Sequence, residues 1–435
     1  MLGGGTWLVQ NKILPGAYIN VFAASRANSA FSERGIATMP YVLDWGAMGE
    51  VIEVTAGDFQ RNSVKLFGYD FTAPQMRPFR ELFRNTRIAL LYRLGTGGVK
   101  AENDYATANY AGERGNALKL IIATNIDDPA RFDVTLLLDG NIVFYQTVAT
   151  ISELAVNDFV VWKNEPLALT PTAGTPFING ASPVITNTNH QSYIDIIEGF
   201  TFNSICCPSG EAVIKQLYSE FTRRMRDDQG IKFQCVTYDN AADYEGVVNV
   251  MNTVKDDGAD AYSLVYWVTG VVAGTAVNKS ALNKIYDGEF EIDVNYTQTQ
   301  LERAIQSGKF GFHRVYDNIR VLADINSLVT LTSEKSDLFQ ENQTIRVIDQ
   351  IANDIALIFN TQYLGIVPND NAGRISLWAD IVQHHQQLQT IRAIENFSGE
   401  DVTVEQGIDK RAVLVNDHVT VVNSMRVLYM QVWIA

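Results

Sequence analysis

The stretch from Phe200 to Tyr238 alternates between strand and helix patterns, and it constrains the fold of this chain more than any other segment. "FTFNSICC" and "IKFQCVTY" are typical of strands. "EAVIKQLYSEFTRRMRDD" between them is typical of an amphipathic helix, with Val213, Leu217 and Phe221 spaced by four residues. A strand, a helix and a second strand in close succession form a βαβ unit, which implies a parallel pair with a right-handed crossover. We therefore expect an α/β core.

An all-β region precedes this unit. Residues 99–165 contain short strand patterns separated by turn residues, among them "ALKLIIATN", "RFDVTLLLDGNIVFYQTVAT" and "DFVVWK". Asp139-Gly140-Asn141 stands between two apolar runs and indicates a hairpin. This pattern predicts a small sandwich. The Pro-, Gly- and Thr-rich segment Leu169–Asn189 is expected to be a loop or linker that leaves it.

Two long helical patterns follow the core. Upstream of them, "VVNVMN" predicts a further strand and "AYSLVYWVTGVVAG" a buried helix. The long helices are expected over 338–363 and 374–395, because apolar residues recur there at three or four positions. Gly365 and Pro368 end the first helix in the expected order. Strands at "DVTVEQ" and "RAVLVNDHVTVV" come next. The apolar residues are Ile345, Ile348, Ile351, Ile355 and Ile358 in the first helix and Ile375, Trp378, Ile381, Leu388 and Ile391 in the second.

Together these patterns predict a multidomain protein of the α+β and α/β classes. A length of 435 residues and a hydrophobic fraction of 46% allow more than one core. We expect a central α/β core with βαβ units, an inserted sandwich-like β domain, a C-terminal α+β domain and extended arms at both ends. The expected boundaries are 1–25 for the N-terminal arm, 26–98 for a small α/β region, 99–181 for the β domain, 182–331 for the core, 332–415 for the C-terminal domain and 416–435 for the C-terminal arm.

The charge balance narrows the classes of partner. The formal net charge is −15, which makes the chain a poor general ligand for nucleic acid. Three cysteines without regular spacing are typical of a reducing compartment. The start of the chain shows no secretory signal, and "AYSLVYWVTGVVAGTAV" is too short and too interrupted to cross a membrane. We expect a soluble chain made in the cytoplasm, without membrane insertion.

No pattern in the sequence predicts a catalytic residue, a cofactor or a metal. His384 and His385 lie in a Gln-rich helical pattern where adjacent side chains point about 100° apart, so a solvated helix surface is expected there instead of metal ligands. Cys206 and Cys207 lack CxxC spacing and are expected to be buried in one core with Cys235. "GTGG" and "VVAGTAVN" match no nucleotide-binding motif, and the chain has no GxSxG elbow.

Four arginines form one basic stripe on a predicted helix. Their spacing in "RPFRELFRNTR" is three, four and three residues. Two interpretations stay open for this stripe: a solvated face that pairs with the acidic excess of the protein, or an ion-pair face between subunits. The four residues are Arg77, Arg80, Arg84 and Arg87.

Both ends of the chain are apolar and have the pattern of extended strands. "TWLVQNKILPGAYINVFAA" has strand-forming residues on both sides of a Pro15-Gly16 turn, and the chain closes on "MRVLYMQVWIA", Met425–Ala435. An exposed apolar strand is an aggregation hazard unless a partner completes it. The closing stretch spans about 36 Å when extended, enough to add a strand to the sheet of a neighbour. A subunit that lends an arm to the next makes a head-to-tail contact, which produces rings or helical filaments.

The ordered set of motifs resembles that of contractile phage tail sheath proteins. "LPGAYINVFA…ERGIATMPYVLDWGAMGEVIEVT" is similar to the family's opening arm, RGI and WG turn. "YAGERGNALKLII" and "FDVTLLLDGNIVFYQTVATISEL" resemble its inserted β domain, and "DNAADYEGVVNVMN", "VVAGTAVNKSALNKIYDG" and "NIRVLADINSLVTLT" its α/β core. "RVIDQIANDI" and "VTVVNSMRVLYMQVWIA" resemble its C-terminal domain and arm. The resemblance is nearest to the compact sheath type of Gram-positive phages, prophages and phage-like particles.

The resemblance implies a structural subunit that polymerises helically, as stacked hexameric rings, around a tail tube and contracts to drive the tube through the host envelope. It implies contacts with other copies, the tube protein, the baseplate and the tail terminator, in a virion assembled in the host bacterial cytoplasm. The helices at 338–363 and 374–395 are then the candidates to face the tube, and "DVTVEQ" is the candidate acceptor edge. The implied arm residues are Trp7, Leu8, Val9, Ile13, Tyr18, Ile19, Val21, Val421, Val427, Leu428, Tyr429, Met430, Val432, Trp433 and Ile434, with Val402 and Val404 on the acceptor edge.

Two alternatives stay open. Within the class, the chain could be the sheath of a tailocin or of another contractile injection particle, which the sequence does not separate from a phage sheath. From a different class, an α/β enzyme would need a polar cluster at the carboxyl ends of its parallel strands. If the closing stretch is a donated strand, alternation places Val427, Tyr429, Gln431 and Trp433 on one face and Leu428, Met430, Val432 and Ile434 on the other.

Overall fold

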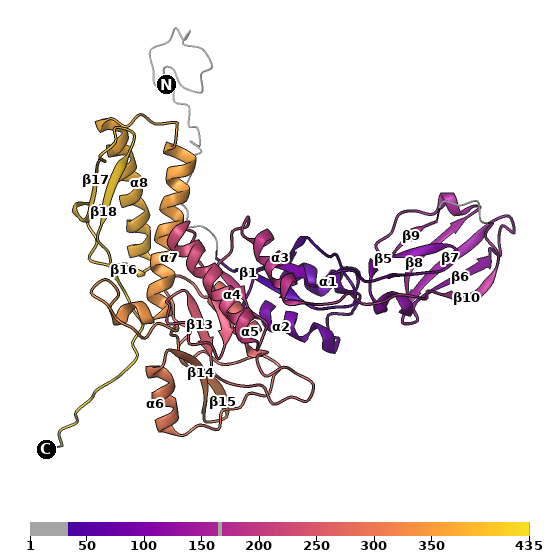
Figure 1. The fold of residues 1–435 in the computed structure, drawn as a ribbon, viewed down its shortest axis with the longest axis horizontal. Helices are drawn as coiled ribbons and strands as arrows, with labels where there is room; N and C mark the ends of the chain where they lie inside the picture. The colour runs from indigo at the N-terminus through magenta and orange to yellow at the C-terminus, as the bar shows by residue number, and fades with distance from the viewer. Residues whose placement is uncertain (1–33, 164–167, 435) are drawn as a thin grey trace, which may run out of the picture.

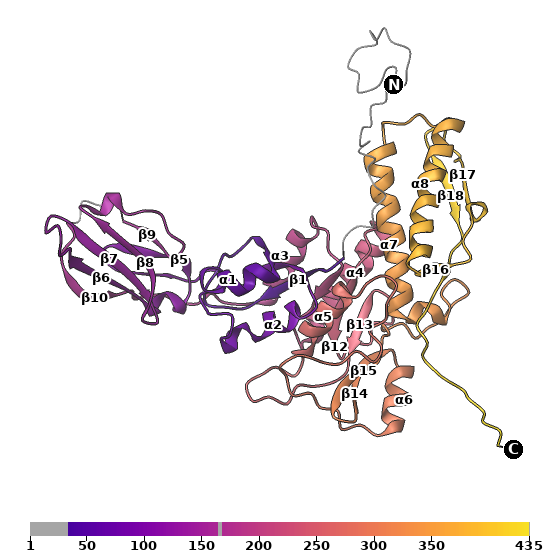
Figure 2. The same ribbon diagram turned by 180° about the vertical axis from the view of Figure 1, so that it is seen from behind.

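The structure is a computed structural model of the chain, and it describes residues 34–163 and 168–434. The molecule is elongated, with a β-sandwich at one end and a pair of long helices at the other (Figure 1). The same arrangement is seen from behind in Figure 2, where the C-terminal segment leaves the body as an extended tail. This confirms the multidomain α+β architecture with a β-sandwich and a C-terminal α+β part.

An eight-stranded mixed sheet forms the centre of the molecule, in the order β15-β14-β13-β12-β11-β1-β3-β2. The strands between β14 and β3 are parallel, and β15 and β2 are antiparallel at the two edges. The predicted βαβ unit is present, since Ile205 of β11 lies opposite Cys235 of the parallel strand β12. The strands are β1 Ile36–Tyr41, β2 Val51–Thr55, β3 Ile88–Arg93, β11 Ser204–Cys206, β12 Gln234–Tyr238, β13 Val247–Val250, β14 Lys309–Val315 and β15 Asn318–Ala323.

Helices cover both faces of this sheet. One face packs on α1 (Ala56–Phe67), α2 (Arg77–Phe83) and α5 (Leu264–Gly274), and the other on α3 (Asn187–Ile197) and α4 (Ala212–Arg223). Helix α6 (Gln298–Gln306) packs on β14. Helix α5 is buried along nearly its whole length, as its apolar sequence predicts.

The cysteines and helix α4 show how the two faces divide the core. All three cysteines are buried and free, and burial raises the pKa of each thiol. Cys207 and Cys235 lie in the core under α3 and α4, whereas Cys206 lies in the core under α5, so the prediction of one shared core is only partly right. In α4, Val213 is 68% exposed, and the buried stripe runs instead through Ile214, Tyr218 and Phe221.

The inserted β domain consists of two antiparallel sheets, ordered β10-β6-β7-β8 and β4-β5-β9. The predicted hairpin joins β7 to β8, and Asp139 (φ 51°) and Gly140 (φ 81°) adopt the left-handed conformation that such a two-residue turn requires. The segment expected to be only a linker contains β10, an edge strand of the sandwich. The strands are β4 Lys100–Glu102, β5 Ala106–Ala111, β6 Leu118–Thr124, β7 Phe132–Leu138, β8 Asn141–Val148, β9 Val160–Trp162 and β10 Thr172–Pro176.

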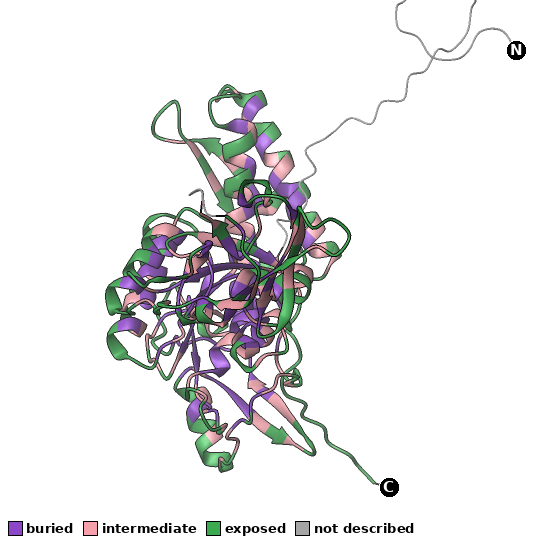
Figure 3. Cartoon of the chain, turned by 90° about the vertical axis from the view of Figure 1, so that its right-hand side faces the viewer, coloured by how far each residue is buried: buried purple, intermediate pink, exposed green. Residues whose placement is uncertain are grey.

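The C-terminal part contains two long helices and two small sheets. Helix α7 (Asn342–Ile358) continues into a π-turn at Phe359–Tyr363, and α8 (Asn371–Thr390) is capped by Asp370, whose side chain accepts from Gly373 N. Strand β17 (Val402–Gln406) pairs with β18 (Val413–Asp417), and β16 (Ile394–Glu395) pairs with β19 (Thr420–Val421). Figure 3 shows that these helices project from the body with one side buried and one side exposed. None of the helices in the described part of the chain is both long and apolar enough to cross a membrane.

Candidate assembly interface

The C-terminal tail is an apolar segment in water. Residues 427–434 have no regular secondary structure and are all exposed. Trp433 is 87% exposed and Tyr429 90%. Contiguous exposed apolar side chains of this size usually mark an interaction site. Among the described residues, no strand pairs with the segment that the sequence predicts to be a donor strand.

The segment just before this tail is held by its own subunit. Val421 was expected in the donor strand, but it lies in β19 opposite Ile394, and Val422 N donates to Ala393 O at 2.9 Å. Further contacts run to Arg426, whose Nη1 lies 2.7 Å from Glu341 Oε1. The described part of the predicted C-terminal arm, residues 416–434, thus divides into an anchored part and an exposed part.

The predicted N-terminal arm residues, Trp7, Leu8, Val9, Ile13, Tyr18, Ile19 and Val21, lie outside the described residues. The first described residue, Arg34, is fixed at the end of helix α5. Its Nη2 donates to Val272 O at 2.9 Å and its Nε to Thr275 O at 3.2 Å, carbonyls at the negative end of the helix dipole. Burial, and next the nearby Arg346, lower the pKa of Arg34 to about 10.

The predicted acceptor edge forms one side of the β17–β18 hairpin. At the two ends of this hairpin, Gly407 N donates to Ala412 O and His418 N donates to Asp401 O. In an antiparallel pair, every second residue turns its main-chain N–H and C=O toward the partner strand. The main-chain groups of the residues between, Val402, Val404 and Gln406, therefore point away from β18. Among the described residues, β17 pairs with no other strand. Val402 is buried against α8, where Trp378 Nε1 donates to its carbonyl at 3.1 Å.

The histidine pair of α8 is buried, so the prediction of a solvated helix surface is wrong. His384 Nε2 lies 3.0 Å from Asp354 Oδ2 on α7, and His385 Nε2 lies 2.8 Å from Asp417 Oδ2 on β18. The two Nδ1 atoms are 3.3 Å apart. The pair therefore joins α7, α8 and the β17–β18 hairpin, which carries the predicted acceptor edge. The sequence around the two histidines did not indicate this role, because their carboxylate partners, Asp354 and Asp417, come from distant segments of the chain.

Helix α7 buries polar residues more completely than several of its isoleucines. Asn342, Gln343, Thr344, Arg346, Asp349, Gln350 and Asp354 are buried, whereas Ile348, Ile351 and Ile355 are only half-buried. On α8 the predicted core residue Ile375 is exposed. The apolar spacing located both helices. It did not show that α7 packs between the C-terminal part and the part that contains the central sheet, where it meets charged partners. We find no sequence pattern that distinguishes these buried polar residues.

Two arginines of the predicted stripe lie on α2 and pair within the subunit, whereas Arg84 is the C-cap of this helix and Arg87 lies beyond its end. Arg77 Nη2 lies 2.7 Å from Asp256 Oδ1, and Arg80 Nη2 lies 2.7 Å from Glu289 Oε2. Both arginines are largely buried, while Arg84 and Arg87 are on the exposed side. Pairing with acidic residues of the same chain therefore agrees with the first interpretation, but Arg77 and Arg80 do not lie on a solvated face.

The carboxyl ends of the parallel strands hold structural groups. Cys206 ends β11 and Cys207 follows it, and burial raises the pKa of both thiols, which disfavours the nucleophilic thiolate. Arg93 ends β3, and its guanidinium donates to Leu43 O, Gly46 O and Ala111 O at 2.7–2.8 Å. In the described ranges no group of three or more His, Cys, Asp or Glu residues could hold a metal ion.

Four family models match consecutive parts of the chain. They are the tail sheath protein Gp18 domain III N-terminal region (residues 34–94), the phage tail sheath protein beta-sandwich domain (96–182), the phage tail sheath protein central domain (184–327) and the phage tail sheath C-terminal domain (334–435).

Individual proteins agree with these models. The chain is similar to the XkdK protein of the phage-like element PBSX from Bacillus subtilis, with 29% identity over 99% of both chains. The solved sheath tail protein of Desulfitobacterium hafniense is 36% identical, with a TM-score of 0.82 over 94% of this chain and 98% of that one. The solved sheath tail protein of Listeria innocua is 29% identical, with a TM-score of 0.79 over 92% and 94%.

The arrangement of a lateral sandwich, a central mixed sheet and a C-terminal helical unit with a free tail defines a structural subunit of a contractile tail sheath. The chain belongs to the phage tail sheath protein family, as the sequence resemblance predicts. It is accordingly a component of a phage-type tail.

Proposed function

We propose that the tail Val427–Ile434 is a donor strand that completes the sheet of a second copy of this chain. The observation that carries this proposal is the exposure of a segment that is apolar except for Gln431, at the end of an anchored chain. Its span is about 26 Å when extended. The outer edge of β17, with Val402 and Val404, is the acceptor that fits it, since its main-chain groups point away from β18, with the Val402 carbonyl accepting from Trp378 at one end of this edge. We propose that Trp7–Phe22 is the second donor.

We propose further that the subunits form hexameric rings stacked around a tail tube, with the baseplate and tail terminator at the two ends. Helices α7 and α8 would face the tube, and the sandwich would point outward. The opposite positions of these two parts along the long axis of the molecule support this orientation (Figure 1). Assembly would take place in the host bacterial cytoplasm. The division into six parts that the sequence predicts, from the arm at 1–25 to the arm at 416–435, is part of this proposal.

A strand-exchanged joint suits a sheath that contracts. The main-chain hydrogen bonds of the donated strand hold two copies together, while the flanking residues let the bodies rotate. Contraction would draw on interfaces between bodies that pack better in the contracted state, a difference between two discrete packings. The contraction would drive the tube through the host envelope.

Removal of residues 427–435 tests the donor strand. We expect a folded protein with an unchanged thermal transition, because the tail is exposed and forms no hydrogen bond or ion pair with the described part of its own body, and we expect no tubes on a negatively stained grid. A truncation from residue 419 is less clean, because it also removes β19. A second variant replaces Val427–Ile434 by Gly and Ser residues, which keeps the length of the chain and removes its strand preference. We expect this variant to form no tubes either. Normal tubes from the truncated protein would overturn the proposal.

A sheath of a tailocin or another injection particle would share every feature described above, and a neighbouring capsid gene would separate the two. The enzyme alternative predicts a small closed oligomer on a sizing column, whereas a sheath gives monomers or tubes.

A further inference from the structure

The side-chain amide of Gln343 grips the main chain at the base of the C-terminal tail. Its Nε2 donates to Val422 O at 3.1 Å, and its Oε1 accepts from Ser424 N at 3.0 Å and from Ser424 Oγ at 2.9 Å. The bonds to Val422 O and Ser424 N are those that a neighbouring strand would make with alternate residues of this segment. A single side chain therefore continues the pairing that β19 ends at Val421.

Two further contacts flank this grip. Thr344 Oγ1 and the amide of Asn423 are hydrogen-bonded at 3.1 Å, and Glu341 Oε1 holds Arg426 Nη1 at 2.7 Å. Beyond Arg426, the tail forms no hydrogen bond or ion pair with the described part of the body. The residues that hold the chain lie at the start of α7: Glu341 is its N-cap, and Gln343 and Thr344 are in its first turn. We call these three residues the clasp.

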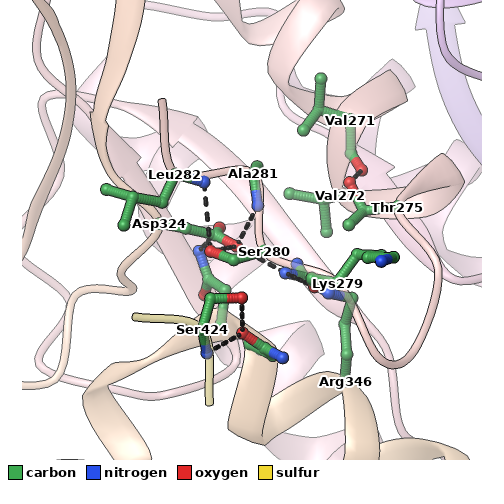
Figure 4. Close-up of polar contacts among 12 residues, drawn as sticks. Val271, Val272, Thr275, Lys279, Ser280, Ala281, Leu282, Asp324, Arg346 and Ser424 are labelled. Carbon is green, nitrogen blue, oxygen red and sulfur yellow. Dashed lines mark hydrogen bonds and ion pairs between the residues drawn. The ribbon is translucent and has the colours of Figure 1, made fainter. Parts of the chain in front are cut away.

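The clasp stands on a rigid base. Arg346, one turn further along α7, pairs with the buried Asp324, and its Nη2 also donates to Lys279 O at 3.0 Å. Asp324 further accepts from Ala281 N at 2.8 Å. Figure 4 shows Asp324, Ser280 and Arg346 gathered beside Ser424. Asp324, Lys279 and Ala281 belong to the part of the chain that contains the central sheet, so Arg346 fixes the start of α7 to that part. The tail is therefore anchored where α7 meets the central part, and not only by the short β16–β19 ladder.

We propose that the clasp fixes the direction in which the C-terminal tail leaves its subunit, so that only Val427–Ile434 is free to pair with a second copy of this chain. The inference rests on the proposed function of the tail. With the clasp intact, the chain bends from Val427 onward. Without it, the chain bends from Val422, which lengthens the tether, lowers the effective concentration of the strand at its acceptor and loosens the spacing between copies.

Hydrogen exchange on the monomer tests the clasp without any assembly. We expect the Ser424 amide to exchange slowly in the wild-type protein and at least about tenfold faster in Gln343→Ala, which removes its acceptor. Gln306→Ala, at an exposed glutamine of α6, is the matched control and should leave the rate unchanged. An unprotected Ser424 amide in the wild-type protein, or an equal rate in Gln343→Ala, would overturn the inference.

A second variant acts from the tail side, in case Gln343→Ala does not fold. Ser424→Pro removes the donor N–H in an exposed segment, so the core is not at risk. In the microscope, we expect both variants to give several-fold fewer tubes than the control, or tubes of variable pitch. Tubes identical to wild type would overturn the role of the clasp in assembly. If the truncation at 427 still assembles, the donor-strand proposal fails, and the exchange rates still decide whether the clasp holds the chain.

Discussion

Arg226 and Asp349 form a two-point ion pair, with Nη1–Oδ2 at 2.6 Å and Nη2–Oδ1 at 2.8 Å, in which both side chains are almost completely buried. Arg226 stands in the π-turn after α4 and Asp349 on α7, so the pair fastens the C-terminal helices to the central body. Burial alone would lower the pKa of Arg226, but the Asp349 carboxylate more than offsets this, and the pKa lies above its ordinary value.

Asp349→Asn should lower the free energy of unfolding by roughly 3–5 kcal/mol, because it leaves a buried guanidinium without its counter-charge. Urea unfolding followed by circular dichroism measures this loss. The double variant Arg226→Met with Asp349→Leu should recover most of it, because an apolar pair of similar volume avoids the cost of burying charge. A loss below about 1 kcal/mol for Asp349→Asn, within the range of ordinary surface changes, would contradict this account.

Arg93→Lys should loosen the sandwich from the central sheet. The guanidinium of Arg93 donates to three carbonyls, one of which, Ala111 O, belongs to β5 of the sandwich. An ammonium group cannot reproduce this planar fork, so the conservative change is expected to cost roughly 3 kcal/mol. Faster proteolysis of the loop around Gly46 would accompany the loss. Arg61→Lys, at a largely exposed arginine of α1, should change neither stability nor cleavage.

His385→Ala should release the β17–β18 hairpin from α8. The substitution removes the contact of His385 with Asp417 and opens a cavity beside Phe397. We expect a loss of about 2 kcal/mol and faster amide exchange in β17 and β18, with the central sheet unchanged. His418→Ala, at the exposed histidine after β18, is the matched control. Unchanged exchange in the hairpin would show that the histidine pair does not hold it.

Glu81→Gln should change how stability depends on pH. Burial raises the pKa of Glu81 from 4.5 to about 7, although Glu289 N and Tyr286 Oη donate to its carboxylate. Because the folded protein binds this proton more tightly than the unfolded chain, the contribution of Glu81 to stability is complete below about pH 4.5 and is lost as the pH rises through 7.

The difference in unfolding free energy between wild type and Glu81→Gln should therefore shift by up to ~3 kcal/mol, against the wild type, between pH 4.5 and pH 7.5. Unfolding in urea at a series of pH values measures this. A difference that does not vary with pH would mean that folding does not raise the pKa of Glu81.

Local patterns predicted the elements whose cause is local. The spacing of Ile345, Ile351 and Ile358 located α7, and Asp139-Gly140 located a hairpin, because helix period and turn conformation depend on neighbours in the chain. The apolar closing stretch predicted a segment that its own subunit does not bury. These conclusions needed no contact between distant residues.

The tertiary structure decided which residues meet. Ala37 pairs with Ser204 in one sheet, and Asp354 and Asp417 come to His384 and His385 from different elements. No local pattern encodes such pairings, because a polar group can be buried only where a hydrogen-bonding partner lies beside it, and here the partner comes from a distant part of the chain. The sequence by itself determined that the closing stretch is apolar and has the pattern of an extended strand. Which of its neighbours the body holds, from Val422 to Arg426, depends on Gln343 and Glu341, which folding brings to the chain at the start of α7.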